Sequence, residues 1–299
     1  MSSRFQLQWV IDERDAGLII RDFLKSNDIS RTALTDIKFK GGNILVNGDA
    51  VTVRYQLKER DLLTIIFPTE EPSAGISSED IPLDILFEDE YLLIVNKPAY
   101  MNTIPSREHP DGSLANALIG YYGKIGLPAT SHIVTRLDRN TSGMVLIAKH
   151  RHIHHLFSMM QRSHTVKRTY EAFAEGDIHD DAGVITAPIG RKEQSIIERE
   201  VRPDGQFART HYRVVNRHRQ FTQLELQLET GRTHQIRVHM SYLGHPLLGD
   251  DLYGGNTALI KRQALHCKKI CFTHPITLQE MTFTAELPID MKNVLEAEL

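Results

Sequence analysis

One short segment near the start of the chain divides it into two parts of unequal size. Residues 69–80 read TEEPSAGISSED, a run rich in proline, serine, glycine and acidic residues that lacks any periodic apolar pattern. Such a composition is typical of a linker. We therefore expect a small unit over residues 14–68 and a large unit over residues 81–299. A chain of 299 residues with 41% hydrophobic content is long enough for two cores.

The small unit shows the pattern of two helices followed by a hairpin and a strand. Apolar residues recur at helical spacing in residues 17–25 and again after Ser30, which is suited to cap a second helix. Asn47-Gly48 then lies between two runs of β-forming residues, which is a strong hairpin signal. A last strand is predicted over residues 62–67.

The large unit alternates many short β-like runs with few helices. Its best helix candidates are residues 151–163 and 232–243. Many strands with few helices predict an α+β fold whose central sheet is mixed and mostly antiparallel. The predicted strands are residues 91–95, 143–148, 169–174, 208–215, 221–229 and 281–285.

The overall composition excludes several classes of protein. The net charge is −3, so any basic surface must be local. No stretch approaches 18 consecutive apolar residues, and Arg4 and Gln6 fall where a signal peptide needs its apolar core. Two cysteines, Cys267 and Cys271, in so long a chain are typical of an intracellular protein. We therefore expect a cytoplasmic protein without a membrane span.

The sharpest chemical pattern lies in residues 136–143, which read RLDRNTSG. Asp138 has Arg136 and Arg139 close by, and a carboxylate with two arginine neighbours should remain ionised. Turn-forming residues follow and lead into the apolar run 144–148, so Asp138 is predicted on a loop before a buried strand. Catalytic groups are common in such places. A surface loop with ordinary salt bridges would show the same short pattern.

A second cluster of polar residues lies in residues 230–239, which read TGRTHQIRVH. A strand is predicted to end at Gly231 and a helix to begin after it. Helix N-termini and arginine forks both suit phosphate groups. A solvated helix face explains the cluster equally well. The polar members are Arg232, His234, Gln235, Arg237 and His239.

A local basic segment precedes a tyrosine. Residues 149–168 contain five lysines and arginines, five histidines and no acidic residue. This composition suits contact with phosphates, and it also suits an ordinary solvated helix face. Tyr170 follows at the start of a predicted strand, and Lys97 ends another strand. A turn rich in glycine and aspartate occupies residues 248–254, and each of these features is weak by itself.

Taken together and in this order, the motifs resemble those of the RluA-type pseudouridine synthase family. The family's aspartate signature reads RLDRNTSG here, and its strand that ends in Lys-Pro reads VNKP. Its tyrosine segment reads KRTYEAFAEG, and its late arginine motif reads TGRTHQIRVHM, followed by LGHPLLGDDLYG and ALHC. The match spans about residues 81–286. In the small unit, SRTALTDIKFKGGNILVNG resembles the alpha-L RNA-binding domain, a module of a small-subunit ribosomal protein.

The resemblance implies a role for each matching residue. It places the nucleophile at Asp138, a tyrosine that stacks under a flipped-out base at Tyr170, and the arginine that pairs with the nucleophile at Arg237. It also implies that Arg136 fills the space that the base leaves. Most relatives have a histidine where this chain has Thr135. RNA contacts are expected from Arg136, Arg139, Lys167, Arg168, Arg232, His234, Gln235 and Lys97.

The reaction that the resemblance implies needs neither a cofactor nor a metal ion. Pseudouridine formation breaks the N-glycosidic bond of uridine, turns the uracil and rejoins it through carbon, so no atoms are gained and no cofactor is expected. A carboxylate can stabilise or trap the ribosyl fragment. We also predict no metal site, because the histidines and cysteines near residues 266–274 lack zinc-ligand spacing and those at 152–155 lack the HExxH pattern.

The expected partner is RNA. Large-subunit ribosomal RNA is the first choice of target and transfer RNA the alternative, and we expect a monomer without membrane contact. A non-catalytic RNA-binding factor for ribosome assembly is a second hypothesis, although pure binding does not need a carboxylate between arginines. A glycoside hydrolase or nucleosidase would need a second carboxylate as its acid, and none is tied to these motifs.

Overall fold

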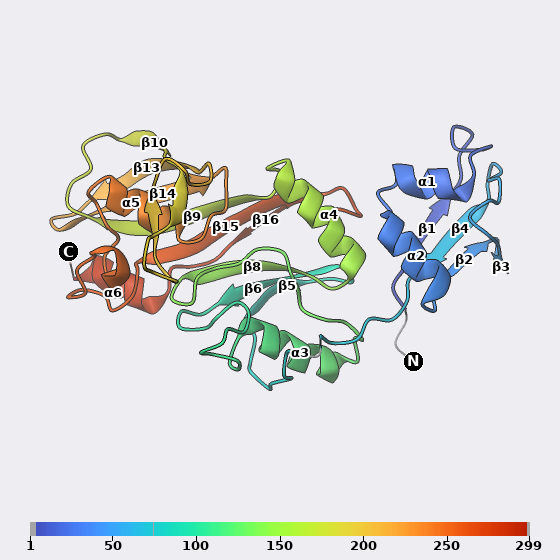
Figure 1. Ribbon diagram of the computed structural model, residues 1–299, viewed down its shortest axis with the longest axis horizontal. Coiled ribbons are helices and arrows are strands. Elements are labelled where there is room, and N and C mark those ends of the chain that lie inside the picture. Colours follow the sequence, from blue (N-terminus) through green and yellow to red (C-terminus); the bar gives the residue numbers. More distant parts are fainter. Residues whose placement is uncertain (1–3, 74, 298–299) are drawn as a thin grey trace.

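The chain forms two units of unequal size that lie next to each other (Figure 1). A computed structural model describes residues 4–73 and 75–297. The larger unit contains a ten-stranded sheet and the smaller one a four-stranded sheet. The described residues between 69 and 80 contain neither helix nor strand, and they connect the two units.

The small unit packs two helices on a sheet with its own apolar core, to which Phe23, Ile44 and Leu63 contribute. The Ser30 hydroxyl accepts a hydrogen bond from the backbone N–H of Ala33 at 3.1 Å, which confirms the predicted cap. The strands run in the order β1-β4-β2-β3. The elements are β1 (Gln6–Val10), α1 (Ile20–Ser26), α2 (Arg31–Phe39), β2 (Asn43–Val46), β3 (Asp49–Ala50) and β4 (Leu62–Ile66).

The small unit begins earlier than the sequence predicted. Strand β1 pairs antiparallel with β4, from Gln6 opposite Ile66 to Val10 opposite Leu62. The expected start at residue 14 is therefore too late. The signal was present, since QLQWV alternates polar and apolar residues as a half-buried strand does.

The large unit is built around strand β15 (Leu265–Thr273). On one side β15 pairs in parallel with β8 (Ser142–Ala148), beyond which lie β6 and β5. On the other side it pairs antiparallel with β9 (Lys167–Glu175), beyond which lie β14, β13 and β10. The other strand pairs among the described residues are antiparallel, which confirms the predicted mixed, mostly antiparallel α+β fold. The further elements are β5 (Ile85–Glu88), β6 (Leu92–Lys97), α3 (Leu114–Ile125), β7 (His132–Ile133), α4 (Arg151–Arg162), β10 (Ala182–Thr186), β11 (Ile189–Arg191), β12 (Arg199–Val201), β13 (Arg209–Arg217), β14 (Phe221–Leu228), α5 (Gln235–Tyr242), a 3-10 turn η1 (Asp251–Tyr253), β16 (Glu280–Thr284) and α6 (Ile289–Glu296).

Strand β8 lies at the centre of the large unit and is buried along its whole length. Its apolar run fits a strand that is covered on both faces. Gly143 has φ +112°, and a Cβ there would lie 2.4 Å from the carbonyl oxygen of Cys267 on β15. The glycine that ends the RLDRNTSG motif thus permits the close parallel pairing of β8 with β15.

The small unit contacts the large one at the start of α4. The ring of Phe5 stacks on His150 with 4.1 Å between ring centroids. Arg151 forms a 2.9 Å ion pair with Asp36 of α2. Glu70, in the connecting segment, accepts the backbone N–H of Arg151 at 2.8 Å and so caps α4. None of the helices in the described part of the chain has the length and apolar character needed to cross a membrane.

Candidate active site

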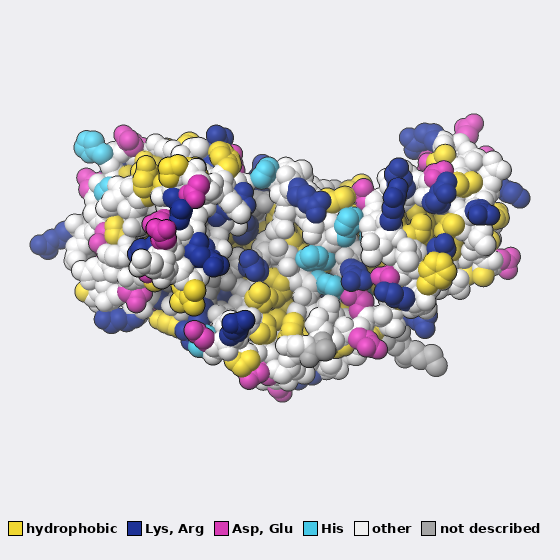
Figure 2. All heavy atoms as spheres, viewed as in Figure 1, with side chains coloured by type: hydrophobic (Ala, Val, Ile, Leu, Met, Phe, Trp, Pro, Cys, Tyr) yellow, Lys and Arg dark blue, Asp and Glu magenta, His cyan; other side chains and the backbone are white. Residues whose placement is uncertain are grey.

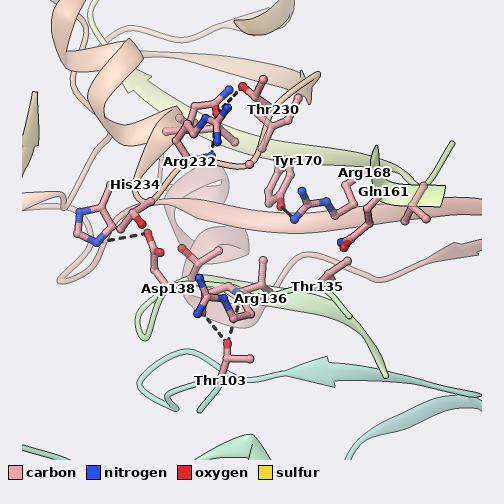
Figure 3. Close-up of a pocket in the computed structure, with 18 of the residues that line it drawn as sticks. Thr103, Thr135, Arg136, Asp138, Gln161, Arg168, Tyr170, Thr230, Arg232 and His234 are labelled. Carbon is pink, nitrogen blue, oxygen red and sulfur yellow. Dashed lines mark hydrogen bonds and ion pairs between the residues drawn. The ribbon is translucent and has the colours of Figure 1, made fainter. Parts of the chain in front are cut away.

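A cavity of about 1220 Å³ brings together the segments that the sequence singled out. Residues 133–139 line it from the β8 side of β15, and residues 166–168 and 227–237 line it from the β9 side. Figure 3 shows Asp138, Tyr170 and His234 around this space. The cavity exceeds the range of about 300–1,000 Å³ that is usual for small-molecule sites. Its size suits a segment of a polymer.

The lining of the cavity is basic although the whole chain is not. Among its residues, only Asp138 and Glu229 are acidic. Figure 2 shows Lys and Arg side chains around the hollow in the middle of the molecule and again on the small unit. This is the local basic surface that a net charge of −3 conceals. The lysine and arginine residues in the lining are Arg136, Arg139, Arg162, Lys167, Arg168, Arg232 and Arg237.

Side chains from neighbouring segments hold the loop of Asp138 on both sides. Before it, the Thr103 hydroxyl donates to the carbonyl of Leu137 at 2.6 Å and accepts its N–H at 3.1 Å. After it, the Lys97 ammonium donates to the carbonyl of Arg139 at 3.2 Å. The backbone around Asp138 is thereby fixed before any substrate binds.

Lys97 lies inside the protein and not among the residues that line the cavity, so the structure gives no support to its predicted RNA contact. The residue is fully buried, and its ammonium also donates to the carbonyls of Pro98 and Met101 at 2.8 Å each. Burial lowers the pKa of Lys97 to about 7, although the nearby Asp138 opposes this shift. Because three carbonyls take its three hydrogens, the ammonium serves the loop and not a ligand.

Arg237 faces Asp138 from helix α5. Its Nη1 donates to Oδ2 of Asp138 at 3.3 Å, as the resemblance implied. Its Nε and Nη2 donate to the two carboxylate oxygens of Asp250 at 2.7 and 2.8 Å. Burial disfavours the charge of Arg237, but the hydrogen bonds that it donates to Asp250 outweigh this effect and raise the pKa of Arg237. Asp138 therefore faces a permanent cation.

Tyr170 lines the same cavity from strand β9. It is only 3% exposed, and burial raises its pKa, so its hydroxyl stays protonated. Arg168 donates to that hydroxyl at 3.0 Å. The tyrosine is thus held in place, with the cavity on one side of it.

The remaining predicted RNA contacts fall into two groups. Arg136, Arg139 and Lys167 are exposed at the cavity, and no described side chain or backbone group accepts a hydrogen bond from their charged ends. Arg232 donates to the carbonyl of Phe207 at 2.9 Å. His234 places Nε2 3.9 Å from Oδ2 of Asp138.

Gln235 is engaged within the protein, although it lies in the wall of the cavity, and its predicted RNA contact stays a prediction. The residue is 2% exposed. Its amide oxygen accepts from the Thr230 hydroxyl and the Arg232 N–H, and its amide nitrogen donates to the carbonyl of Arg209 and to Thr210. Gln235 therefore orders the turn that leads into α5.

Sequence reasoning missed two residues that complete the site. Asp250 and Tyr253 lie in the turn rich in glycine and aspartate, for which the motif alone suggested no role. Asp250 is fully buried against Arg237, and Tyr253 hydrogen-bonds His234 at 2.7 Å. The described residues contain no group of three or more potential metal-ligating side chains.

Comparison with known proteins places these observations in a family. The family model for RNA pseudouridylate synthase matches residues 91–242. An uncharacterised RNA pseudouridine synthase of Bacillus subtilis strain 168, YjbO, is 52% identical over 94% of this chain and 99% of its own length. A protein of Vibrio parahaemolyticus named ribosomal large subunit pseudouridine synthase D is 39% identical over 90% of this chain and 87% of its own.

The fold agrees with this relationship. The human RNA pseudouridylate synthase domain containing 4 superposes with a TM-score of 0.59 at 24% identity, over 71% of this chain and 91% of that one. This similarity bears on the fold alone, whereas the matches above extend over nearly the whole sequence. The chain therefore belongs to the RNA pseudouridylate synthase family as a member of the RluA type, an isomerase that converts uridine in RNA to pseudouridine.

Proposed function

We propose that this enzyme isomerises specific uridines of large-subunit ribosomal RNA, with Asp138 as the nucleophile toward a uridine that has left its base stack. One observation carries the proposal. The Asp138 carboxylate lies in a basic cavity, on a loop held from both sides, and faces the buried guanidinium of Arg237. The sequence matches to proteins named ribosomal large subunit pseudouridine synthase D support the choice of RNA.

The proposed isomerisation of uridine needs one carboxylate and no added reagent. The bond between N1 of uracil and C1′ of ribose breaks, the uracil turns, and a bond forms between C5 and C1′. C5 loses its proton and N1 gains one, so the atoms balance without a cofactor. Asp138 traps or stabilises the electron-poor ribosyl carbon while the base turns. Arg237 contacts that carboxylate at Oδ2 and holds it at the cavity.

The extruded base needs a surface that holds it through the turn. Tyr170 offers an aromatic ring in the wall of the cavity, and stacking on such a ring is worth about 1–3 kcal/mol. Arg136 is exposed beside Asp138 and is long enough to enter the gap that the base leaves in the RNA. Arg139, Lys167, Arg168 and Arg232 supply charge for the flanking phosphates.

We also propose that the small unit is the alpha-L RNA-binding domain and adds affinity and not chemistry. Helix α2 exposes Phe39 to 74%, with the Lys38 ammonium 4.8 Å from the centre of its ring. An exposed aromatic ring among cations suits contact with an unpaired base and its phosphates. The ion pair between Asp36 and Arg151 connects this helix to α4 of the large unit.

The test is to map pseudouridines in all RNA from cells that lack the gene. We expect one or more positions in large-subunit ribosomal RNA to remain uridine and to be restored by the wild-type gene but not by Asp138→Asn. If pseudouridine is lost only from transfer RNA, the proposed target is wrong but the proposed reaction still holds. An unchanged map, together with no tritium release from RNA labelled at uridine C5 by the purified protein, would favour a non-catalytic assembly factor.

A further inference from the structure

His234 occupies a strained backbone position that the helix itself does not require. It is the N-cap residue of α5, with φ +57° and ψ 20°, in the left-handed region. Its side chain makes no capping hydrogen bond, although N-caps normally use a short polar side chain for that purpose. Strain of this kind at a non-glycine residue persists where the surroundings hold the side chain for another task.

Tyr253 holds the ring of His234. The hydroxyl of Tyr253 accepts the backbone N–H of Arg199 at 2.9 Å and lies 2.7 Å from Nδ1 of His234. The guanidinium of Arg237 lies 4.9 Å from the centre of the tyrosine ring, on the side of the active site. The backbone N–H of Arg199 and the guanidinium of Arg237 can only donate hydrogen bonds. The nearest described acceptor for the hydroxyl hydrogen of Tyr253 is therefore Nδ1 of His234.

This hydrogen bond selects one tautomer of the neutral imidazole. With Nδ1 accepting, the single ring proton lies on Nε2. Nε2 is 3.9 Å from Oδ2 of Asp138, the same oxygen that Nη1 of Arg237 contacts at 3.3 Å. Among the described residues, no group donates a hydrogen bond to Oδ1 of Asp138.

The surroundings keep His234 neutral. Burial lowers its pKa, and the charge of Arg237 acts in the same direction, while Asp138 and Asp250 oppose them. A neutral donor can approach the carboxylate without adding a second cation to the one that Arg237 supplies. Active-site hydrogen bonds that are long in the free enzyme commonly shorten when substrate binds.

We propose that His234 is a positioning residue for Asp138: Tyr253 fixes its tautomer, its Nε2–H engages Oδ2 together with Arg237, and Oδ1 is thereby the oxygen that meets the ribose. This inference rests on the proposed role of Asp138 as nucleophile. It gives His234 a task different from the RNA contact expected from the sequence. It also gives Tyr253 a task, through the histidine, in the same reaction.

The first experiment observes the tautomer directly. Nitrogen-15 spectra of the full-length enzyme labelled at histidine distinguish a protonated Nε2 from a protonated Nδ1, and the signals that vanish in His234→Gln assign the residue. We expect Nε2–H in the wild-type enzyme at pH 7.5 and a mixture of tautomers in Tyr253→Phe. A wild-type ring protonated on Nδ1 overturns the inference, whatever the activity of the variants.

The second experiment measures single-turnover rates with RNA labelled at uridine C5. His234→Ala should lower the rate at saturating RNA by about 10- to 100-fold, by analogy with the loss of hydrogen-bond partners that orient metal ligands. His234→Gln keeps an N–H near the position of Nε2 and should recover most of that loss. Tyr253→Phe should lower the rate by about tenfold. Tyr242→Phe, at an exposed tyrosine on the same helix, is the matched control and should react at the wild-type rate.

The outcomes separate this inference from the proposed function. If His234 only contacts RNA, His234→Ala raises the KM in a salt-dependent way and leaves the rate at saturation within about threefold. That result overturns the positioning role while an inactive Asp138→Asn still supports the nucleophile. An active Asp138→Asn defeats the proposed function itself. Melting temperatures within a few degrees of the wild type show that lost rate does not reflect unfolding.

Discussion

Arg237 and Asp250 form a bidentate ion pair inside the protein, with hydrogen bonds of 2.7 and 2.8 Å. Asp250 is fully buried, so no water competes for its carboxylate. The cation that faces Asp138 is therefore held in place by a second carboxylate behind it. Such support orients an active-site group without contact with the substrate.

Removal of Asp250 should cost both stability and activity. Asp250→Ala leaves the Arg237 guanidinium buried without its partner, and breaking a buried pair in this way costs about 3–5 kcal/mol. Urea unfolding at pH 7.5 measures the loss. Asp251→Asn, at the exposed neighbouring position, is the control and should change stability by less than about 0.5 kcal/mol. Equal stability of the two variants would contradict the structural role of the pair.

Asp138→Asn should abolish isomerisation and leave RNA binding intact. The amide keeps the shape of the side chain but lacks the charge that a nucleophile needs. Single-turnover assays measure the reaction, and filter binding measures the affinity for the same RNA. Activity within about tenfold of the wild type, which corresponds to about 1.4 kcal/mol of barrier, would exclude Asp138 as the nucleophile.

Two substitutions at Tyr170 separate its ring from its hydroxyl. Tyr170→Leu removes the stacking surface and should lose most turnover, since stacking is worth about 1–3 kcal/mol per base. Tyr170→Phe keeps the ring, removes the hydroxyl with its hydrogen bonds to Arg168 and Cys267, and should keep most of the rate. If Tyr170→Leu instead lowers mainly the melting temperature, the tyrosine is a core residue and not a platform for the base.

Acid should destabilise the enzyme through the buried histidine of α4 that contacts the small unit. His152 is 4% exposed, and its ring stacks on Phe67 with 5.4 Å between centroids. Burial lowers the pKa of His152 to about 4, against a usual value of about 6.5. Between pH 4 and pH 6.5, His152 binds a proton in the unfolded chain but not in the folded one. The stabilising contribution is therefore present above pH 6.5 and lost as the pH falls toward 4.

His152→Phe tests that contribution. The phenylalanine keeps the stacking and does not titrate. Between pH 7 and pH 4.5, its free energy of unfolding should fall by about 2 kcal/mol less than that of the wild type. His179→Gln alters an exposed histidine and should follow the wild-type profile. Parallel pH profiles for all three proteins would show that His152 does not set the acid sensitivity.

A fragment that starts at Ile81 should keep the reaction and bind RNA less tightly. The large unit has its own apolar core, so circular dichroism should show a folded fragment. Loss of the cations around Phe39 should weaken binding to full-length RNA more than to a short stem-loop that fills only the cavity. Unchanged affinity and unchanged choice of uridine would show that the small unit does not bind RNA.

Local patterns predicted the parts of this molecule that depend on near neighbours in sequence. The Ser30 cap and helix α4 follow from periodicity and capping residues, and the loop of Asp138 follows from its turn formers. Helix α3 was not predicted, because Gly120 and Gly123 weaken its helical pattern. A Cβ at Gly120 would lie 1.9 Å from the carbonyl oxygen of Glu79, so this glycine lets the connecting segment cross the helix.

The rest of the site depends on contacts between distant segments. The sequence around Lys97 does not show that its ammonium is surrounded by backbone carbonyls. One of these carbonyls belongs to Arg139, which is 42 residues away. The family resemblance implied that Asp138 and Arg237 are partners, but it did not reveal Asp250 behind them. In the sequence alone, a buried lysine or aspartate cannot be distinguished from one that faces solvent.

The position of β15 in the chain has a consequence for how the protein is made. The strand occupies residues 265–273 and lies between β8 and β9, so in the described sheet the strands on the side of Asp138 meet those on the side of Tyr170 through β15. A polypeptide emerging from the ribosome carries the complete RLDRNTSG loop long before that strand exists. Because such distant pairing forms late, we expect each copy to gain activity only when translation is nearly finished.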